Sequence, residues 1–182
     1  MMRRHLGGLI VALAGSAALL LPGTGALAAL PERYHAMVVQ PSGGPDRAEF
    51  DLVPALDRAR REHKRLYVYL GASDCAYCRR YEAFLARNAD ELVPQFSRHN
   101  FLLVDLRSNL STLASKLFIR VGPRSLPYAE FQRSIGDERA RLLVYPSVWL
   151  FDENAKPLMQ MPAGTGTFET VAEQLEILRL EQ

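Results

Sequence analysis

The chain has 182 residues, of which 48% are hydrophobic and 23% are charged, a composition typical of a globular protein of one domain. Its formal net charge is only +2 at pH 7, with 22 basic and 20 acidic side chains. The basic residues between positions 58 and 65 alternate with apolar and acidic ones, as on a solvated helix face, so we expect no binding to nucleic acid.

Residues 1–28 have the features of a signal peptide. Arg3 and Arg4 precede an apolar run, Leu6–Leu21, that is short for a membrane span. The tripeptide Ala26-Leu27-Ala28 fits the small-x-small pattern found before a cleavage site. We therefore predict a periplasmic or secreted protein, with an uncleaved N-terminal membrane anchor as the alternative.

Residues 29–50 form an N-terminal extension in this interpretation. Residues 34–39 are compatible with a short edge strand, and the turn-forming residues at 40–46 predict a loop. A helix is predicted over Asp51–Lys64, where Asp51 can cap the first turn. His63 lies near its exposed end, and we interpret it as solvated rather than as a ligand.

An apolar strand, Leu66–Leu70, leads through Gly71 to the two cysteines of the chain. From Cys78 onward, apolar residues recur at three- and four-residue steps, which predicts an amphipathic helix that ends before Pro94. We expect Cys75 to be exposed at the N-terminus of this helix. The unpaired N–H groups and the helix dipole there favour a thiolate, which is the reactive form.

Alternatives to a redox role for the Cys75–Cys78 pair are weaker. A purely structural disulfide would close a loop of about four residues and contribute only about 2 kcal/mol. A zinc site needs four ligands, and the sequence has no second cysteine pair or paired histidines. A c-type haem is excluded because position 79 is arginine rather than histidine. The spacing therefore favours a redox-active disulfide and no bound metal.

The remaining elements follow from the hydrophobic pattern and the turn residues. We predict strands at 101–106, 144–151 and 158–161, with the last two forming an antiparallel hairpin, and helical segments at 111–119, 128–142 and 167–180. In the last helix we expect Phe168, Val171, Ala172, Leu175 and Leu178 to share one face. Thr170 and Glu173 have the spacing of a capping box.

The order of these elements resembles the thioredoxin fold from about Asp51 to the C-terminus. The motifs that carry the resemblance are Ala72-Ser73-Asp74-Cys75-Ala76-Tyr77-Cys78 and Tyr145-Pro146-Ser147. The resemblance implies an α/β fold with a central mixed sheet of about four strands, flanked by helices, and a domain over residues 51–182. It also implies a helical insertion at about 107–143, before the strand that a cis-proline opens. Pro146 would then lie beside the cysteines, and its neighbouring backbone would pair with a substrate peptide.

The sequence departs from the family at positions that bear on mechanism. Thioredoxins carry a buried carboxylate six residues before the first cysteine, where this chain has Tyr69, and a proline where it has Ala83. Glu82, four residues after Cys78, could accept a proton instead, although pairing with Arg79 on a solvated helix face is the interpretation we favour from sequence. Lys116–Pro123 also resembles a segment before a cis-proline, but no apolar strand follows Pro123.

The resemblance implies a thiol–disulfide oxidoreductase with Cys75, Cys78 and Pro146 as its catalytic residues. Tyr77, Glu82, Tyr145 and Ser147 are the expected supporting residues, and Tyr145 and Trp149 are expected to pack around the site or in the core. We expect protein thiols or disulfides as substrates, a membrane or periplasmic redox partner, no cofactor and a monomer. Whether the protein reduces, oxidises or isomerises disulfides stays open.

Two other classes of function are compatible with the sequence. Met159 and Met161 lie on one face of a predicted strand, and thioethers with thiolates suit Cu(I), so a periplasmic copper carrier is one alternative. Methionines at strand spacing are more often core residues. A thioredoxin-fold interaction module that has lost turnover is the other alternative.

Overall fold

The computed structural model describes residues 29–44, 46–137, 142–162 and 169–179. Its centre is a mixed sheet of five strands in the order β1-β4-β3-β7-β8. Strands β1, β4 and β3 run parallel, whereas β7 is antiparallel to β3 and β8 is antiparallel to β7. The strands are β1 (Met37–Val39), β3 (Arg65–Ala72), β4 (Phe101–Ser108), β7 (Ser147–Phe151) and β8 (Pro157–Pro162).

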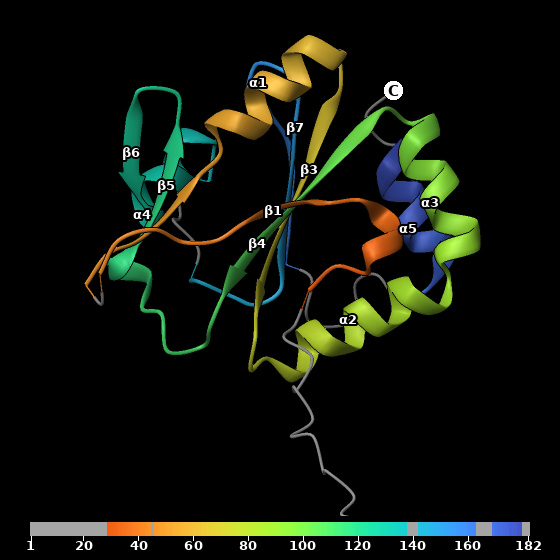
Figure 1. Cartoon of the computed structure of the whole chain (residues 1–182), viewed down its shortest axis with the longest axis horizontal. Helices are drawn as coiled ribbons and strands as arrows, with labels where there is room; N and C mark the ends of the chain where they lie inside the picture. The colour runs from red at the N-terminus through yellow and green to blue at the C-terminus, as the bar shows by residue number, and fades with distance from the viewer. Residues whose placement is uncertain (1–28, 45, 138–141, 163–168, 180–182) are drawn as a thin grey trace, which may run out of the picture.

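Helices cover both faces of this sheet (Figure 1). One face packs against α2 (Ala76–Arg87), α3 (Ala89–Arg98) and α5 (Val171–Arg179), and the other faces α1 (Val53–Glu62) and α4 (Tyr128–Ser134). Alternation along β3 divides its side chains between the two cores, because successive residues of a strand point to opposite faces. Tyr67 and Tyr69 join the core under α2, whereas Val68 joins the core under α1.

A second sheet of three strands lies beside the first, in the order β2-β5-β6. Its strands are β2 (Ala48–Asp51), β5 (Leu117–Val121) and β6 (Arg124–Pro127). The helix predicted at 111–119 is wrong: this stretch holds one 3-10 turn, η2 (Ala114–Lys116), and the start of β5. Leu117 and Ile119 are both buried, so the apolar pattern has the two-residue period of a strand.

The helix that follows the cysteines is divided at Asn88, and Pro94 lies inside α3 rather than beyond its end. The backbone carbonyl of Asn88 accepts the N–H groups of Glu91 and Leu92, which starts the new helix. The carbonyl that Pro94 leaves without a helical donor belongs to Asp90, an exposed residue, so water can take the place of that donor. The predicted end of the cysteine helix, at about Ala89–Val93, is therefore close to the end of α2 at Arg87, but α3, which continues through Pro94, was not predicted from the sequence.

Other elements lie near their predicted positions. The edge strand is β1, the hairpin is β7–β8, and Asp51 accepts the N–H of Val53 at 2.9 Å at the start of α1. His63 is solvated, as expected. Helix α4 ends at Ser134, and residues 138–141 of the predicted helix lie outside the described residues.

Helix α5 has its predicted capping box, because the N–H of Thr170 donates to Glu173 at 3.0 Å and the N–H of Glu173 donates to the Thr170 hydroxyl at 3.3 Å. Its buried face differs from the prediction: Ala172 is exposed, and Gln174 and Ile177 are buried. Phe168 lies outside the described residues. Among those residues, no helix has both the length and the apolar character that crossing a bilayer requires.

Candidate functional site

The two cysteines lie where β3 ends and α2 begins, and they form a disulfide with their Cα atoms 5.2 Å apart. Cys75 is the N-cap residue of α2, and its Sγ accepts the backbone N–H of Cys78 at 3.0 Å. The N–H of Ala72 points at the Sγ of Cys78 at 3.4 Å. Each sulfur therefore has a backbone donor that would stabilise a thiolate after reduction.

Cys75 is buried, with 3% of its surface exposed, which contradicts the expectation of an exposed cysteine. The covering group is the segment before β7. Tyr145 packs against the buried cluster of Ala72, Cys75 and Cys78, and its carbonyl oxygen lies 3.7 Å from the Sγ of Cys75. The hydrophobic periodicity correctly predicts that Cys75 lies at the start of the helix, but it contains no information about the distant segment that covers this cysteine. The Tyr145–Pro146 peptide bond, at the start of β7, is cis.

The side chains around Pro146 are anchored to the rest of the site. The hydroxyl of Tyr145 is 2.9 Å from the hydroxyl of Ser108 at the end of β4, and burial raises the pKa of this tyrosine. Ser147 donates to the carbonyl of Val144 at 2.6 Å. Trp149, by contrast, is fully buried and packs against Phe131, so it belongs to the core under α4 rather than to the site.

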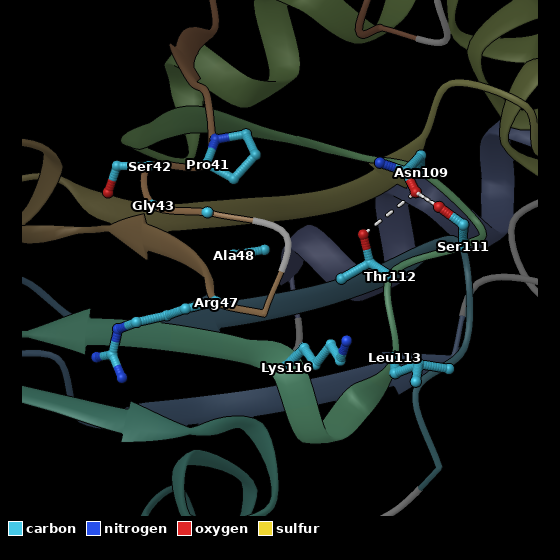
Figure 2. A pocket seen from close by; sticks show the side chains of 11 residues that line it. Pro41, Ser42, Gly43, Arg47, Ala48, Asn109, Ser111, Thr112, Leu113 and Lys116 are labelled. Atoms are coloured by element: carbon cyan, nitrogen blue, oxygen red, sulfur yellow. Dashed lines mark hydrogen bonds between the residues drawn. The ribbon is translucent and has the colours of Figure 1, made fainter.

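The loop after β4 flanks the cysteines, which sequence reasoning missed. Asp74 does not cap α2; its Oδ1 accepts the N–H of Leu110 at 2.8 Å and so joins the cysteine turn to this loop. Figure 2 shows the same loop, at Asn109 and Leu113, lining a pocket of about 380 Å³ with Lys116. Tyr77, between the cysteines, is 58% exposed. The exposed residues of the site thus include Asp74, Ala76, Tyr77 and this loop.

Glu82 is a buried carboxylate on α2, with 8% of its surface exposed, and the interpretation as a solvated partner of Arg79 is wrong. The hydroxyl of Tyr69 donates to its Oε1 at 2.7 Å. Burial raises the pKa of Glu82 to about 7, even though the Tyr69 hydrogen bond works against this rise. Gly71 keeps room for this contact, because a Cβ there would lie 2.6 Å from the Tyr69 ring.

Asp105 is a second buried carboxylate, with 1% of its surface exposed, and sequence reasoning did not single it out. It lies on β4 directly opposite Tyr69. Its Oδ2 accepts the N–H of Leu30 at 3.2 Å and the Nε of Arg107 at 3.0 Å, and burial raises its pKa. A lone acid inside the apolar run Phe101–Leu106 was the available signal.

The described residues contain no group of three or more histidine, cysteine or acidic side chains arranged to hold a metal. Met159 packs, partly buried, against the core under α2, as expected for a core methionine. Met161 is opposite Val148 in the β7–β8 ladder.

A disulfide at the first turn of a helix, beside a proline-led strand of a mixed sheet, defines a thioredoxin-like α/β protein. Residues 52–178 match the Thioredoxin-like domain family, and the chain belongs to this family. Its fold class, a mixed sheet flanked by helices, is the one predicted, although the central sheet has five strands rather than about four.

Two solved structures are similar to the chain at 17% sequence identity. One is a thioredoxin-fold protein from Helicobacter pylori, with a TM-score of 0.40 over 64% of this chain and 67% of that chain. The other is a candidate thiol:disulfide interchange protein DsbE from Chlorobium tepidum, with a TM-score of 0.38 over 68% of this chain and 84% of that chain. No curated protein matches the sequence.

Proposed function

We propose that the protein is an exported thiol–disulfide oxidoreductase that acts on protein substrates through Cys75 and Cys78. The observation that supports this most directly is the disulfide at the first turn of α2, with a backbone donor for each sulfur. Such donors stabilise the leaving and attacking thiolates of an exchange reaction.

The exchange balances without a cofactor. A substrate thiolate attacks the Sγ of Cys75, so a substrate–Cys75 disulfide forms and the Cys75–Cys78 bond breaks, with Cys78 leaving as a thiolate. A second substrate thiolate then displaces Cys75, and the substrate leaves oxidised while the protein holds two thiols. The reverse sequence reduces a substrate disulfide, with Cys78 as the resolving residue. The partner that reoxidises or reduces the two cysteines sets the direction.

Glu82 is the group we assign to proton transfer. It lies four residues after Cys78 on α2, so both side chains are on the same side of the helix. A carboxyl group whose pKa is about 7 changes protonation near neutral pH, which suits a group that takes a proton from one thiol and returns it. The hydrogen bond from Tyr69 fixes the orientation of the carboxylate.

The segment Tyr145–Ser147 is the proposed docking site for the substrate backbone. Pro146 has no backbone N–H, so this position beside Cys75 offers no hydrogen-bond donor of its own. Exposed Tyr77 is placed to contact the same substrate. We propose that residues 1–28 are removed on export, that the redox partner is periplasmic or in the membrane, and that the protein acts as a monomer.

The proposal predicts different outcomes for the two cysteines. Cys75→Ser removes the attacking sulfur, so thiol-dependent reduction of insulin should fall to the uncatalysed rate. Cys78→Ser keeps the first step and removes the resolving one, so it should accumulate mixed disulfides with exported proteins, visible on non-reducing gels and identified by mass spectrometry. Full activity of Cys75→Ser would refute the assignment.

A further inference from the structure

The backbone of the first two described residues lies against the two buried carboxylates. The N–H of Leu30 donates to the Oδ2 of Asp105 at 3.2 Å, and the backbone of Ala29, the residue before it, is close enough to Glu82 to lower the pKa of this carboxyl group. In Figure 1 the coloured trace accordingly starts beside α2. The segment is held there by a separate contact, because the hydroxyl of Tyr34 donates to the carbonyl of Leu85 at 2.9 Å.

Glu82 and Asp105 form a buried acid pair, and the positive charge around them is too small to compensate two ionised carboxylates. Arg107 contacts Asp105 at 3.0 Å, and Arg79 acts on Glu82 only through its charge. The Oδ1 of Asp105 is fully buried and has no hydrogen-bond partner within the described part of the chain. Each buried acceptor without a donor is costly, and a second negative charge nearby adds to that cost. The remaining groups that face the pair are Tyr69 on β3 and, in a pocket beside Asp105, Glu32 and His35.

Ala29 is also the residue that follows the predicted cleavage site at Ala28. We propose that removal of residues 1–28 leaves the α-ammonium group of Ala29 in an ion pair with Glu82, so that the mature N-terminus becomes part of the buried acid site. This inference depends on the proposed function in one respect, because the cleavage after Ala28 occurs only if the protein is exported. Hydrolysis of the Ala28–Ala29 bond by a signal peptidase gives Ala28 a carboxylate and Ala29 an amine, which takes up a proton from water.

An ammonium suits this position better than the amide it replaces. It brings a full positive charge and three N–H donors, whereas the amide has one donor. Hydrogen bonds between charged partners are also stronger than those of a neutral amide. The new charge lowers the pKa of Glu82, since an opposite charge favours the ionised carboxylate. The processed chain should therefore have more of Glu82 ionised, and ready to accept a proton, at neutral pH than the unprocessed chain, in which burial holds the pKa at about 7.

The test compares the natural leader with a leader that carries Gly-Ser-Gly inserted between Ala28 and Ala29. Both chains are exported and purified from the periplasm, and the mass of the N-terminal peptide identifies the first residue. The insertion moves the ammonium three residues away and leaves Ala29 with an amide N–H. Each chain is made with Glu82 and with Glu82→Gln, and the unfolding equilibrium constant is measured in urea for all four. Glu32→Gln, an acid near the same segment, is the matched control.

We expect the mature natural chain to begin at Ala29. We also expect Glu82→Gln to raise the unfolding equilibrium constant about tenfold more in the natural chain than in the inserted chain. A tenfold difference corresponds to the free energy of about one charge-assisted hydrogen bond. Glu32→Gln should show no such difference. Equal effects of Glu82→Gln in the two chains, or a mature N-terminus other than Ala29, would overturn the inference. The insulin assay on the same wild-type sample separates this result from the proposed function, because disulfide exchange by the two cysteines can be measured whether or not Ala29 is paired with Glu82.

Discussion

At the scale of single residues, the carboxylate of this site comes from a helix instead of a strand. Tyr69 occupies the position on β3 where thioredoxins carry their buried acid, and its hydroxyl reaches across the core to Glu82 on α2. The ring is fully buried, and burial together with the nearby Glu82 charge keeps the pKa of the Tyr69 hydroxyl far above its usual value. The tyrosine is therefore a fixed hydrogen-bond donor, and the carboxylate is the group that changes protonation.

Substitutions at these two residues should separate the proton acceptor from its orienting group. In Glu82→Gln no carboxylate can accept the proton, so we expect the rate of insulin reduction near pH 7 to fall by about tenfold or more. Tyr69→Phe removes a hydrogen bond that favours the ionised carboxylate, so the pKa of Glu82 should rise and the pH–rate profile should move to higher pH. A Glu82→Gln profile identical to that of the natural protein would exclude the role.

Some of these residues could be predicted from local sequence patterns, and others could not. The cysteine spacing and the tripeptide around Pro146 are local patterns, and both were recognised. Cys75 and Glu82 both contact segments that are distant in the sequence, residue 145 in one case and residue 69 in the other. Asp105 pairs with Leu30 across 75 positions, and no local pattern encodes such a contact.

At the scale of elements, α5 packs with α2 and α3 against the same face of the central sheet and completes the core there. Its buried Gln174 accepts a hydrogen bond from the Tyr81 hydroxyl at 2.8 Å, and Glu169, two residues before the helix, forms an ion pair with Arg80 at 2.7 Å. The helix is only nine residues long, so the capping box contributes a large part of its local stability.

The capping box gives a direct test of that contribution. Thr170→Ala removes the hydroxyl that accepts the N–H of Glu173, so we expect the free energy of unfolding to fall by about 1 kcal/mol in urea denaturation. Glu173→Gln is the control, because glutamine also completes a capping box and should change stability much less. If both variants matched the natural protein, the cap would have no role in stability.

Elements with a clear period were predictable, and those without one were not. The strands beside the cysteines and α1 have strong apolar patterns and were placed within a few residues. The β5 strand was interpreted as helix because Leu117, Phe118 and Ile119 are consecutive apolar residues, which fit either period over so short a run. The strands that pair with β5 are β2 and β6, which are short and have no alternating apolar pattern from which they could have been predicted.

At the scale of the whole molecule, two carboxylates have opposite electrostatic environments: Glu49 in the small sheet and Glu82 on the helix that covers the central sheet. In the small sheet, hydrogen bonds from Ser125, Arg47 and Arg120 lower the pKa of Glu49 to about 2. In the core between α2 and the central sheet, burial raises the pKa of Glu82, a residue of α2, to about 7. Both groups have the same ordinary value of 4.5, so their shifts make the folding stability depend on pH with opposite signs.

These shifts predict two limbs in a plot of unfolding free energy against pH. The folded protein binds the Glu49 proton less tightly than the unfolded chain, so this stabilisation is present above pH 4.5 and is lost as the pH falls toward about 2. It binds the Glu82 proton more tightly, so stability falls as the pH rises from 4.5 to about 7. The ammonium of Ala29 should reduce this second limb, which makes the chain with the Gly-Ser-Gly insertion the one that shows it fully.

Urea denaturation from pH 2.5 to 8 can assign each limb to its residue. Glu49→Gln should flatten the acid limb without abolishing it, because exposed Glu62 also has a pKa of about 2. Glu82→Gln in the inserted chain should flatten the limb between pH 4.5 and 7 and leave the acid limb unchanged. A Glu82→Gln curve parallel to that of its parent across the whole range would mean that this carboxylate does not titrate differently in the folded and unfolded chains, and both its proton-transfer role and its pairing with Ala29 would lose their electrostatic basis.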